Sequence, residues 1–238
     1  MRVAVLGLGE AGGRIASDLT AAGVDVHGFD PAHGGGSAVE AVRGAEFVLS
    51  LNAASVALDV ARGVADALDP GAVYADLNTG SPELKRELAG AVPVAFADVA
   101  LVGVVPATGL KTAALASGEG AERFAAAFGP LGMPVTVVEN AAGLKLIRSV
   151  FMKGIAAAAI EAVEAGRAAG VEQLVREDIA GVISEPLLDR LLTGSKEHAV
   201  RRTEEMRASA AYLEQLGVEP RIATAAAEWL AQLRDQQS

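Results

Sequence analysis

The glycines near the start of the chain are the residues best placed to bind a ligand. The motif GxGxxG is formed by Gly7-Leu8-Gly9-Glu10-Ala11-Gly12. Between a strand and a helix, its first glycine permits a tight turn and its second lets backbone N–H groups approach a pyrophosphate. The third allows close helix–strand packing, and the helix dipole favours the phosphate charge. The motif predicts dinucleotide binding, with an ordinary glycine turn as the alternative.

Asp30 follows this motif at the end of the second expected strand, where the ribose of a dinucleotide lies in such folds. A carboxylate there accepts hydrogen bonds from the ribose hydroxyls and repels a 2′-phosphate. We therefore expect NAD as the cofactor. Two alternatives stay open: Asp30 only begins a turn with Pro31, or Arg43 or the glycine loop at 33–37 admits NADP.

A parallel sheet would position these residues. Strand-like runs are expected at 3–6, 24–29, 47–51, 73–77, 92–105 and 134–138. Helical patterns are expected at 12–22, 56–68, from Ser81-Pro82 onward, and at 120–128. This alternation predicts an α/β fold, a doubly wound Rossmann-type sheet that is mainly parallel and covered on both faces.

The pattern changes after Glu139. No strand-like alternation follows, and helical periodicity runs unbroken from 144 to 169. Gly170, Pro186 and Gly194 then punctuate further helices. We expect an NAD(P)-binding domain at 1–139 and an all-α substrate and dimerisation domain at 140–238, joined by a long interdomain helix.

Polar residues follow the third and fourth expected strands. Ligands bind at the carboxyl ends of parallel strands. We therefore expect cofactor contacts from the residues at these ends, namely Ser50, Leu51, Asn52 and Thr79. The alternative for the polar members is a local helix N-cap.

Three segments in order resemble the β-hydroxyacid dehydrogenase family, which includes 3-hydroxyisobutyrate and 6-phosphogluconate dehydrogenases. They are residues 7–12, Asp76-Leu77-Asn78-Thr79-Gly80-Ser81-Pro82 and Gly143-Leu144-Lys145-Leu146-Ile147-Arg148-Ser149. The resemblance covers essentially the whole chain. It implies a Rossmann domain, a catalytic Lys on the interdomain helix, and a helical domain that usually dimerises. Residues 145–154 and 198–206 resemble the subgroup with a C-terminal domain of unknown function.

The chain departs from the family at the substrate loop. Where the family has Asp-x-Pro-Val-Ser-Gly-Gly, this chain has Val102 in place of the Ser and Val104 in place of the last Gly. Arg148 and Ser149 stand where the family has an Asn pair. We therefore expect a different substrate, bulkier or less polar than a small 3-hydroxy acid.

Hydride transfer to a carbonyl leaves an alkoxide, so such a site needs a general acid. The resemblance assigns this role to Lys145. Its neighbours are apolar, which would lower the pKa of the lysine by disfavouring its charged form. The alternative is a surface lysine that extends its amine into water.

Further candidate catalytic residues are Ser149, Lys153 and His198. Ser149 and Lys153 lie one and two turns after Lys145 on the helix. Lys153 is alternatively a solvated or interface charge. His198 could reach over the nicotinamide or bind a substrate carboxylate with Arg202, or be plain helix surface.

Composition limits the partners. The formal net charge of −10 disfavours nucleic acid, no apolar run is long enough to cross a bilayer, and no His, Asp or Glu spacing suggests a metal. We expect a cytoplasmic protein with a small-molecule substrate. The long helix is apolar around so much of its circumference that we expect a homodimer to cover it.

These features predict an NAD(P)-dependent oxidoreductase acting on a hydroxy or keto acid or a related carbonyl, with Lys145 as general acid/base. One alternative is an imine reductase, whose proton donor is generally Asp or Tyr. Tyr74 and Tyr212 are the only tyrosines, and neither follows the domain boundary. A second alternative is a non-catalytic NADH-sensing module.

Overall fold

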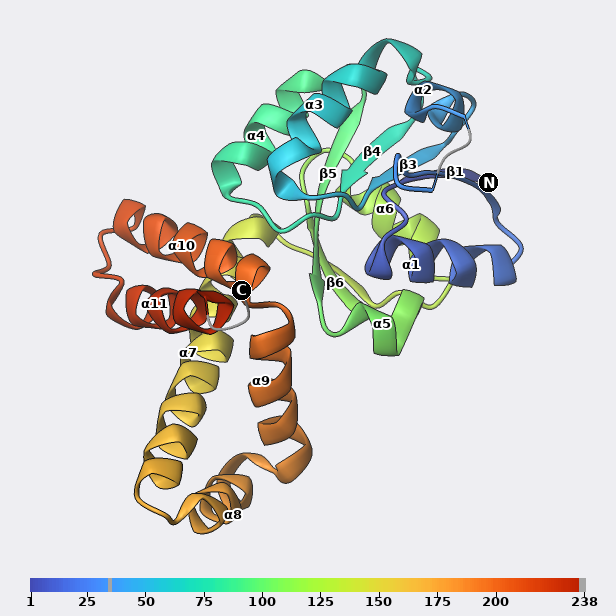
Figure 1. Cartoon of the computed structure of the whole chain (residues 1–238). Coiled ribbons are helices and arrows are strands. Elements are labelled where there is room, and N and C mark those ends of the chain that lie inside the picture. Colours follow the sequence, from blue (N-terminus) through green and yellow to red (C-terminus); the bar gives the residue numbers. More distant parts are fainter. Residues whose placement is uncertain (34–35, 236–238) are drawn as a thin grey trace. The chain divides into compact units, whose positions relative to one another are not determined.

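The computed structural model describes residues 1–33 and 36–235, so residues 34–35 of the expected glycine loop lie outside the described residues. The chain forms two compact units, Met1–Lys145 and Leu146–Ser238 (Figure 1). The first contains the sheet and the second contains helices. The expected order, an α/β half followed by a helical half, is confirmed.

The first unit is built on a seven-stranded sheet in the order β2-β1-β3-β4-β5-β6-β7. Its strands are β1 (Arg2–Leu6), β2 (Asp25–Phe29), β3 (Phe47–Ser50), β4 (Val73–Asp76), β5 (Ala95–Val102), β6 (Ala113–Ser117) and β7 (Val135–Val137). All neighbouring strands are parallel except β5 and β6. The expected mainly parallel sheet is therefore confirmed.

Helices cover both faces of this sheet (Figure 1). They are α1 (Glu10–Ala21), α2 (Ala38–Val42), α3 (Ala54–Val64), α4 (Pro82–Ala91), α5 (Val105–Thr108) and α6 (Ala121–Phe128). In β1, Val3 and Val5 face the core shared with α1, α5 and α6, whereas Ala4 and Leu6 face the core shared with α2, α3 and α4. Because successive side chains of a strand point to opposite faces of the sheet, β1 contributes to two separate cores.

Strand β6 was not expected from the sequence. Its residues are mostly alanine, which favours helices and is depleted in strands. Pairing on both edges, with β5 and β7, overrides that preference. The helix expected at 56–68 also ends earlier, since α3 stops at Val64 and a short 3-10 turn, η1 (Ala65–Ala67), follows.

The chain reverses between β5 and β6 through α5 and a 3-10 turn, η2 (Gly109–Lys111). This reversal is fastened to α1. The Asp18 carboxylate accepts the Leu110 N–H at 2.9 Å, and the Arg14 guanidinium donates to the Pro106 carbonyl at 3.1 Å. The loop after β5 is therefore held against α1.

The second unit contains most of α7 (Ala141–Ala168), which begins in the first unit, and then α8 (Glu172–Ile183), α9 (Glu185–Glu197), α10 (Ala199–Gln215) and α11 (Arg221–Asp235). We expected the apolar surface of α7 to exceed what the chain could cover. Ala157 and Ile160 are buried with residues of α10 and α11, whereas Phe151 on the same helix is 66% exposed. The most exposed large apolar residue is Val182 on α8, at 82%. Within the described residues, no helix is both long and apolar enough to span a membrane.

Replacing Phe128 by Ala should lower the free energy of unfolding by about 3–5 kcal/mol, because a fully buried ring is lost and a cavity remains. The ring packs edge-on against Phe47 at 5.2 Å and stacks on Phe124 at 4.4 Å. Urea titration followed by circular dichroism measures the change. Val56→Ala, at an exposed site on α3, is the control, with an expected change within about 0.5 kcal/mol. Equal midpoints for the two variants would contradict this account of the core.

Candidate active site

The glycine turn joins β1 to α1. Gly7 has φ of +100°, and a Cβ there would lie 2.6 Å from the Leu51 carbonyl oxygen. A Cβ on Gly12 would overlap the Gly7 carbonyl oxygen. Gly9 differs, since a Cβ there would meet nothing within 4 Å. Gly7 and Gly12 therefore allow close packing, and Gly9 leaves open space at the helix start.

The first turn of α1 is open to an anion. Gly9 is the N-cap residue, and no side chain within the described residues caps this helix end. The backbone N–H groups of a first turn lack partners in their own helix, and the dipole adds positive potential there. With Glu10 and Ala11 completing the turn, these residues fit a pyrophosphate group.

Asp30 lies beside this turn. One carboxylate oxygen accepts the Leu8 N–H at 2.7 Å, and the other accepts the Ala32 N–H at 2.9 Å. The hydrogen bonds from Ala32 and then Leu8 hold the pKa of Asp30 below its usual value, so the carboxylate is charged at neutral pH. A carboxylate has about four lone-pair sites, so Asp30 retains capacity to accept hydroxyl groups.

The loops after β3 and β4 meet in a polar network. The Asn78 amide nitrogen donates to the Ser50 hydroxyl and to the Asn52 side-chain oxygen, each at 3.1 Å. The Asn52 amide also donates to Ser50 at 3.1 Å. Leu51 abuts Gly7, and Thr79 follows Asn78 as a half-buried residue. The residues expected at the carboxyl ends of β1 and β3 thus lie together, and Asn78 links them to the end of β4.

A buried lysine lies beneath this network, and sequence reasoning missed it. The Lys85 amine on α4 lies 2.6 Å from an Asp76 carboxylate oxygen and 3.0 Å from an Asp98 carboxylate oxygen. It also donates to the backbone oxygens of Asp76 and Asn78, at 3.0 and 2.9 Å. The sequence did contain a signal for this cluster. It was a lysine on the buried face of an expected helix, together with an Asp in each of two buried strands.

The electrostatics of this cluster depend on Lys85. Burial alone would lower the pKa of its amine, but Asp76 and Asp98 outweigh burial and raise the pKa above the usual value. Lys85 is therefore charged at neutral pH. It balances two carboxylates that are themselves almost fully buried.

The same cluster fixes the start of α7. The second Asp98 oxygen accepts the Ala142 N–H at 2.8 Å, and the Ser117 hydroxyl accepts the Ala141 N–H at 3.1 Å. The Asn140 side chain accepts the next N–H, from Gly143, at 2.8 Å. Three side chains thus satisfy N–H groups that a helix start leaves free. Lys145 follows about one turn into the helix and is half-buried.

Ser149 and Lys153 lie together in the second unit. The Lys153 amine donates to the Ser149 hydroxyl at 3.1 Å and pairs with the buried Glu205 carboxylate at 2.8 Å. Arg201 pairs with the other oxygen of Glu205 at 3.2 Å. Glu205 was not anticipated, because one acidic residue in a charged helical stretch carries no distinctive sequence signal.

His198 lies between α9 and α10 and is half-buried. Its ring makes no hydrogen bond or ion pair to any residue that the structure describes. Arg148 is exposed on α7. In the first unit, the substituted loop presents a half-buried Val102 and a Val104 that is 44% exposed.

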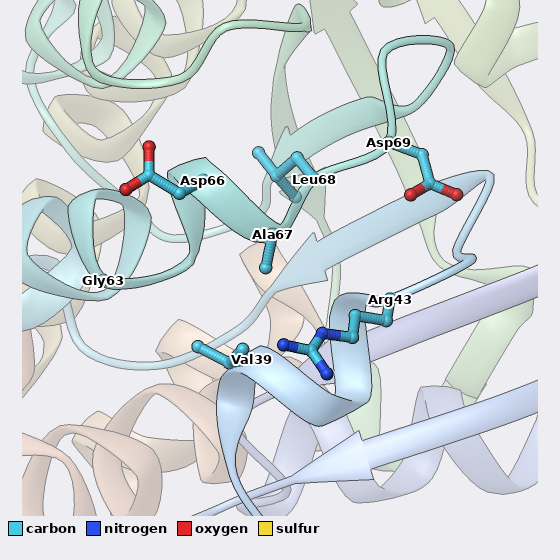
Figure 2. Close-up of a pocket in the computed structure, with 7 residues that line it drawn as sticks. All are labelled: Val39, Arg43, Gly63, Asp66, Ala67, Leu68 and Asp69. Carbon is cyan, nitrogen blue, oxygen red and sulfur yellow. The ribbon is translucent and has the colours of Figure 1, made fainter.

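A cavity of about 620 Å³ lies elsewhere in the first unit (Figure 2). Its lining comprises Val39, Arg43, Gly63, Asp66, Ala67, Leu68 and Asp69. Arg43 and Asp69 precede β3 and β4, so the cavity lies near the amino ends of these strands. The glycine turn follows the carboxyl end of β1. Arg43, which we considered as a partner for a 2′-phosphate, lines this cavity together with two aspartates.

Residues 166–233 match the family described as Domain of unknown function (DUF1932). No curated protein matches the chain. Among similar solved structures is conserved protein MTH1747 of unknown function, reported to resemble 3-hydroxyacid dehydrogenases. It is 27% identical, with a TM-score of 0.75 over 100% of this chain and 98% of that one.

Two further structures share the fold. The Mycobacterium tuberculosis 3-hydroxyisobutyrate dehydrogenase with L-serine is 20% identical, with a TM-score of 0.78 over 97% of this chain and 92% of that one. Psf3 in complex with NADP+ and 2-OPP is 21% identical, with a TM-score of 0.79 over 98% and 94%. The chain thus has the fold of the 3-hydroxyacid dehydrogenases over its whole length, as the sequence resemblance implied.

Replacing Lys85 by Met should lower the free energy of unfolding at pH 7 by about 3–5 kcal/mol, because two buried carboxylates lose their counter-charge. The pKa of Lys85 is raised on folding, so its contribution is full below about pH 10.4 and is lost as pH rises through the folded pKa. The difference in free energy of unfolding between wild type and variant should therefore become smaller at high pH. Urea titrations across pH measure it, with the exposed Lys111→Met as control. A gap as small as that of the control would contradict the charge assignment.

Proposed function

We propose that this protein is an NAD-dependent oxidoreductase that transfers a hydride between nicotinamide and a hydroxy or keto acid or a related carbonyl compound. The observation that carries the proposal is the uncapped first turn of α1 with the ionised Asp30 beside it. The shared fold with 3-hydroxyacid dehydrogenases supports the reaction class. The two halves would then act as cofactor domain and as substrate and dimerisation domain.

Cofactor binding is assigned to the carboxyl ends of the first strands. Gly7, Gly9, Glu10, Ala11 and Gly12 would hold the pyrophosphate, and Asp30 the adenosine ribose. Ser50, Leu51, Asn52 and Thr79 would contact the rest of the dinucleotide. The proximity of Leu51 to Gly7 and the hydrogen bonds joining Asn52 and Asn78 support one continuous surface. NAD is preferred because Asp30 would repel a 2′-phosphate.

The bound nicotinamide would supply or accept the hydride. Lys145 would donate a proton to the substrate oxygen during reduction and take it back during oxidation. Asp98 and Ser117 hold the first N–H groups of its helix, which supports a fixed position for the lysine backbone. Precise placement of this kind is what general acid–base catalysis requires.

Ser149, Lys153 and His198 are proposed to serve the substrate. Lys153 donates to the Ser149 oxygen, which leaves the Ser149 proton available for donation. Lys153 is already paired with Glu205, which holds its amine beside Ser149. His198, with a ring that no described residue engages, keeps both nitrogens for a ligand.

The substrate is proposed to be less polar than a small 3-hydroxy acid. Val102 replaces a hydroxyl that would donate to the substrate, and Val104 adds an exposed apolar side chain to the same loop. A second copy of the chain is part of the proposal. Helix α8 contributes no buried residue, and Leu174 and Val182 on it are 65% and 82% exposed.

Tyr74, one of the two tyrosines, is a poor candidate for the proton donor of an imine reductase. Tyr74 is fully buried in β4 and stacks on Phe96, with ring centroids 6.4 Å apart. Burial raises the pKa of its phenol, which weakens it as an acid. The lysine-based reaction therefore remains the proposal.

Lys145→Ala should lower kcat by about 10²–10⁴-fold, the range for loss of a general acid, while the Kd for NADH stays unchanged. Stopped-flow oxidation of NADH with a panel of keto acids measures the rate, and fluorescence titration measures NADH binding. The exposed Lys111→Ala is the control. Tight NADH binding without turnover on any substrate by the wild type would instead favour an NADH-sensing module.

Asp30→Asn should weaken NADH binding by about tenfold, the scale of one charge-assisted hydrogen bond, and weaken NADPH binding less. The ratio of the two Kd values is the decisive quantity, because distortion of the turn through Leu8 would weaken both cofactors equally. Fluorescence titrations give both values. Asp59→Asn, at an exposed site on α3, serves as the matched control. An unchanged ratio would count against a ribose contact.

A further inference from the structure

Arg202 occupies an unusual environment in the second unit. It lies near the start of α10 and is half-buried. Its Nη1 donates to the Ser195 hydroxyl of α9 at 2.7 Å, and Ser195 is fully buried. The Ser195 hydroxyl in turn donates to the Leu191 carbonyl at 2.6 Å. This chain of bonds fixes one edge of the guanidinium.

Gly194 makes room for the other edge. A Cβ at this position would lie 2.7 Å from Nη2 of Arg202, closer than real Cβ contacts permit. A glycine inside a helix costs about 1 kcal/mol relative to alanine. The space it leaves is filled by the guanidinium, so this part of α9 is shaped around Arg202.

The guanidinium has no carboxylate partner within the described part of the chain. Glu205, the carboxylate that acts most strongly on Arg202, pairs with Lys153 through one oxygen and with Arg201 through the other. Burial lowers the pKa of Arg202, Glu205 and Glu197 oppose that shift, and Arg201 and Arg190 add to it. Around Arg202, the cations Arg190, Arg201 and Lys153 thus outnumber the carboxylates of Glu205 and Glu197, in a chain whose net charge is −10.

Two other arginines of this unit pair with carboxylates. A cavity of about 250 Å³ among α7, α8 and α9 is lined by Arg167 and Arg176. Arg167 pairs with Glu172 at 2.8 Å, and Arg176 pairs with Asp189 at 2.6 Å. Both keep a carboxylate partner although their side chains are 54% and 32% exposed. Arg202 is half-buried and forms no such ion pair with a described residue, which leaves its remaining donors for a carboxylate from outside the chain.

We infer that Arg202 binds the carboxylate of a small organic acid, with Ser195 and Gly194 setting the orientation of its guanidinium. The free donors of a guanidinium form a planar fork that matches two carboxylate oxygens. The inference deepens the proposed function and rests on it in one respect: the acid is taken to be the substrate. A phosphate offers related chemistry, and the experiment separates the two.

Isothermal titration calorimetry on the full chain tests the inference without requiring turnover. The probes are 3-hydroxyisobutyrate, mandelate and 2-oxoisovalerate, each beside its methyl ester, and inorganic phosphate. Titrations are run with and without NADH. The variants are Arg202→Met and Gly194→Ala, and Arg207→Met removes the same charge from an exposed site on α10.

At least one acid should bind the wild type while its ester does not. Arg202→Met should raise the Kd by about 10- to 100-fold, and Arg207→Met should leave it unchanged. Gly194→Ala is the sharper variant. Its methyl group meets only the flexible end of Arg202, so the protein should fold with an unchanged or higher Tm and yet lose most of the affinity.

Several outcomes would overturn the inference. They are equal affinity of the acids and esters, binding of phosphate but of no acid, no binding of any probe by the wild type, and full affinity in either Arg202→Met or Gly194→Ala. These outcomes leave the Lys145 and NADH measurements untouched. Conversely, an Arg202-dependent acid site without turnover would reject the oxidoreductase and retain the carboxylate site.

Discussion

The structure of the sheet's carboxyl edge depends on one buried ammonium group. Asp76 ends β4, and Asp98 lies beside it within the neighbouring parallel strand β5, both in positions that water barely reaches. Two such carboxylates repel each other strongly at low dielectric. Lys85, reaching in from α4, makes their coexistence possible. Asp98 also accepts a hydrogen bond from the first turn of α7. The position of that helix start therefore depends on the same balance of charges. A cluster of this kind gives stability only as a complete set.

Two different physical devices therefore organise the same edge of the sheet. At α1 the device is the absence of side chains: Gly7 and Gly12 let backbone approach backbone, and the helix start is left without a cap. At α7 the device is the opposite, since side chains from two strands and a loop occupy the first N–H groups. One helix end is thus available to a ligand, and the other is consumed in fixing the position of its own residues.

Much of this could be predicted from the sequence, because the signals were local. The glycine motif, the position of Asp30 and the alternation of strand and helix patterns each depend on neighbouring residues. Strand β6 could not be predicted, since its alanines enter the sheet only through pairing with β5 and β7. The ion pairs of Lys85 and Glu205 could not be predicted either. Each joins residues from different elements, and an isolated charged residue in a helix does not reveal which carboxylate or amine the fold brings to it.

The reversal between β5 and β6 has a consequence for how this protein can change. In place of a long crossover helix, a short segment carries the chain back and is tied to Arg14 and Asp18 of α1. The segment carrying Val102 and Val104 therefore shares its anchorage with the glycine-turn helix. Substitutions in that segment must therefore remain compatible with Arg14 and Asp18. We expect α1 and the segment to change together in evolution.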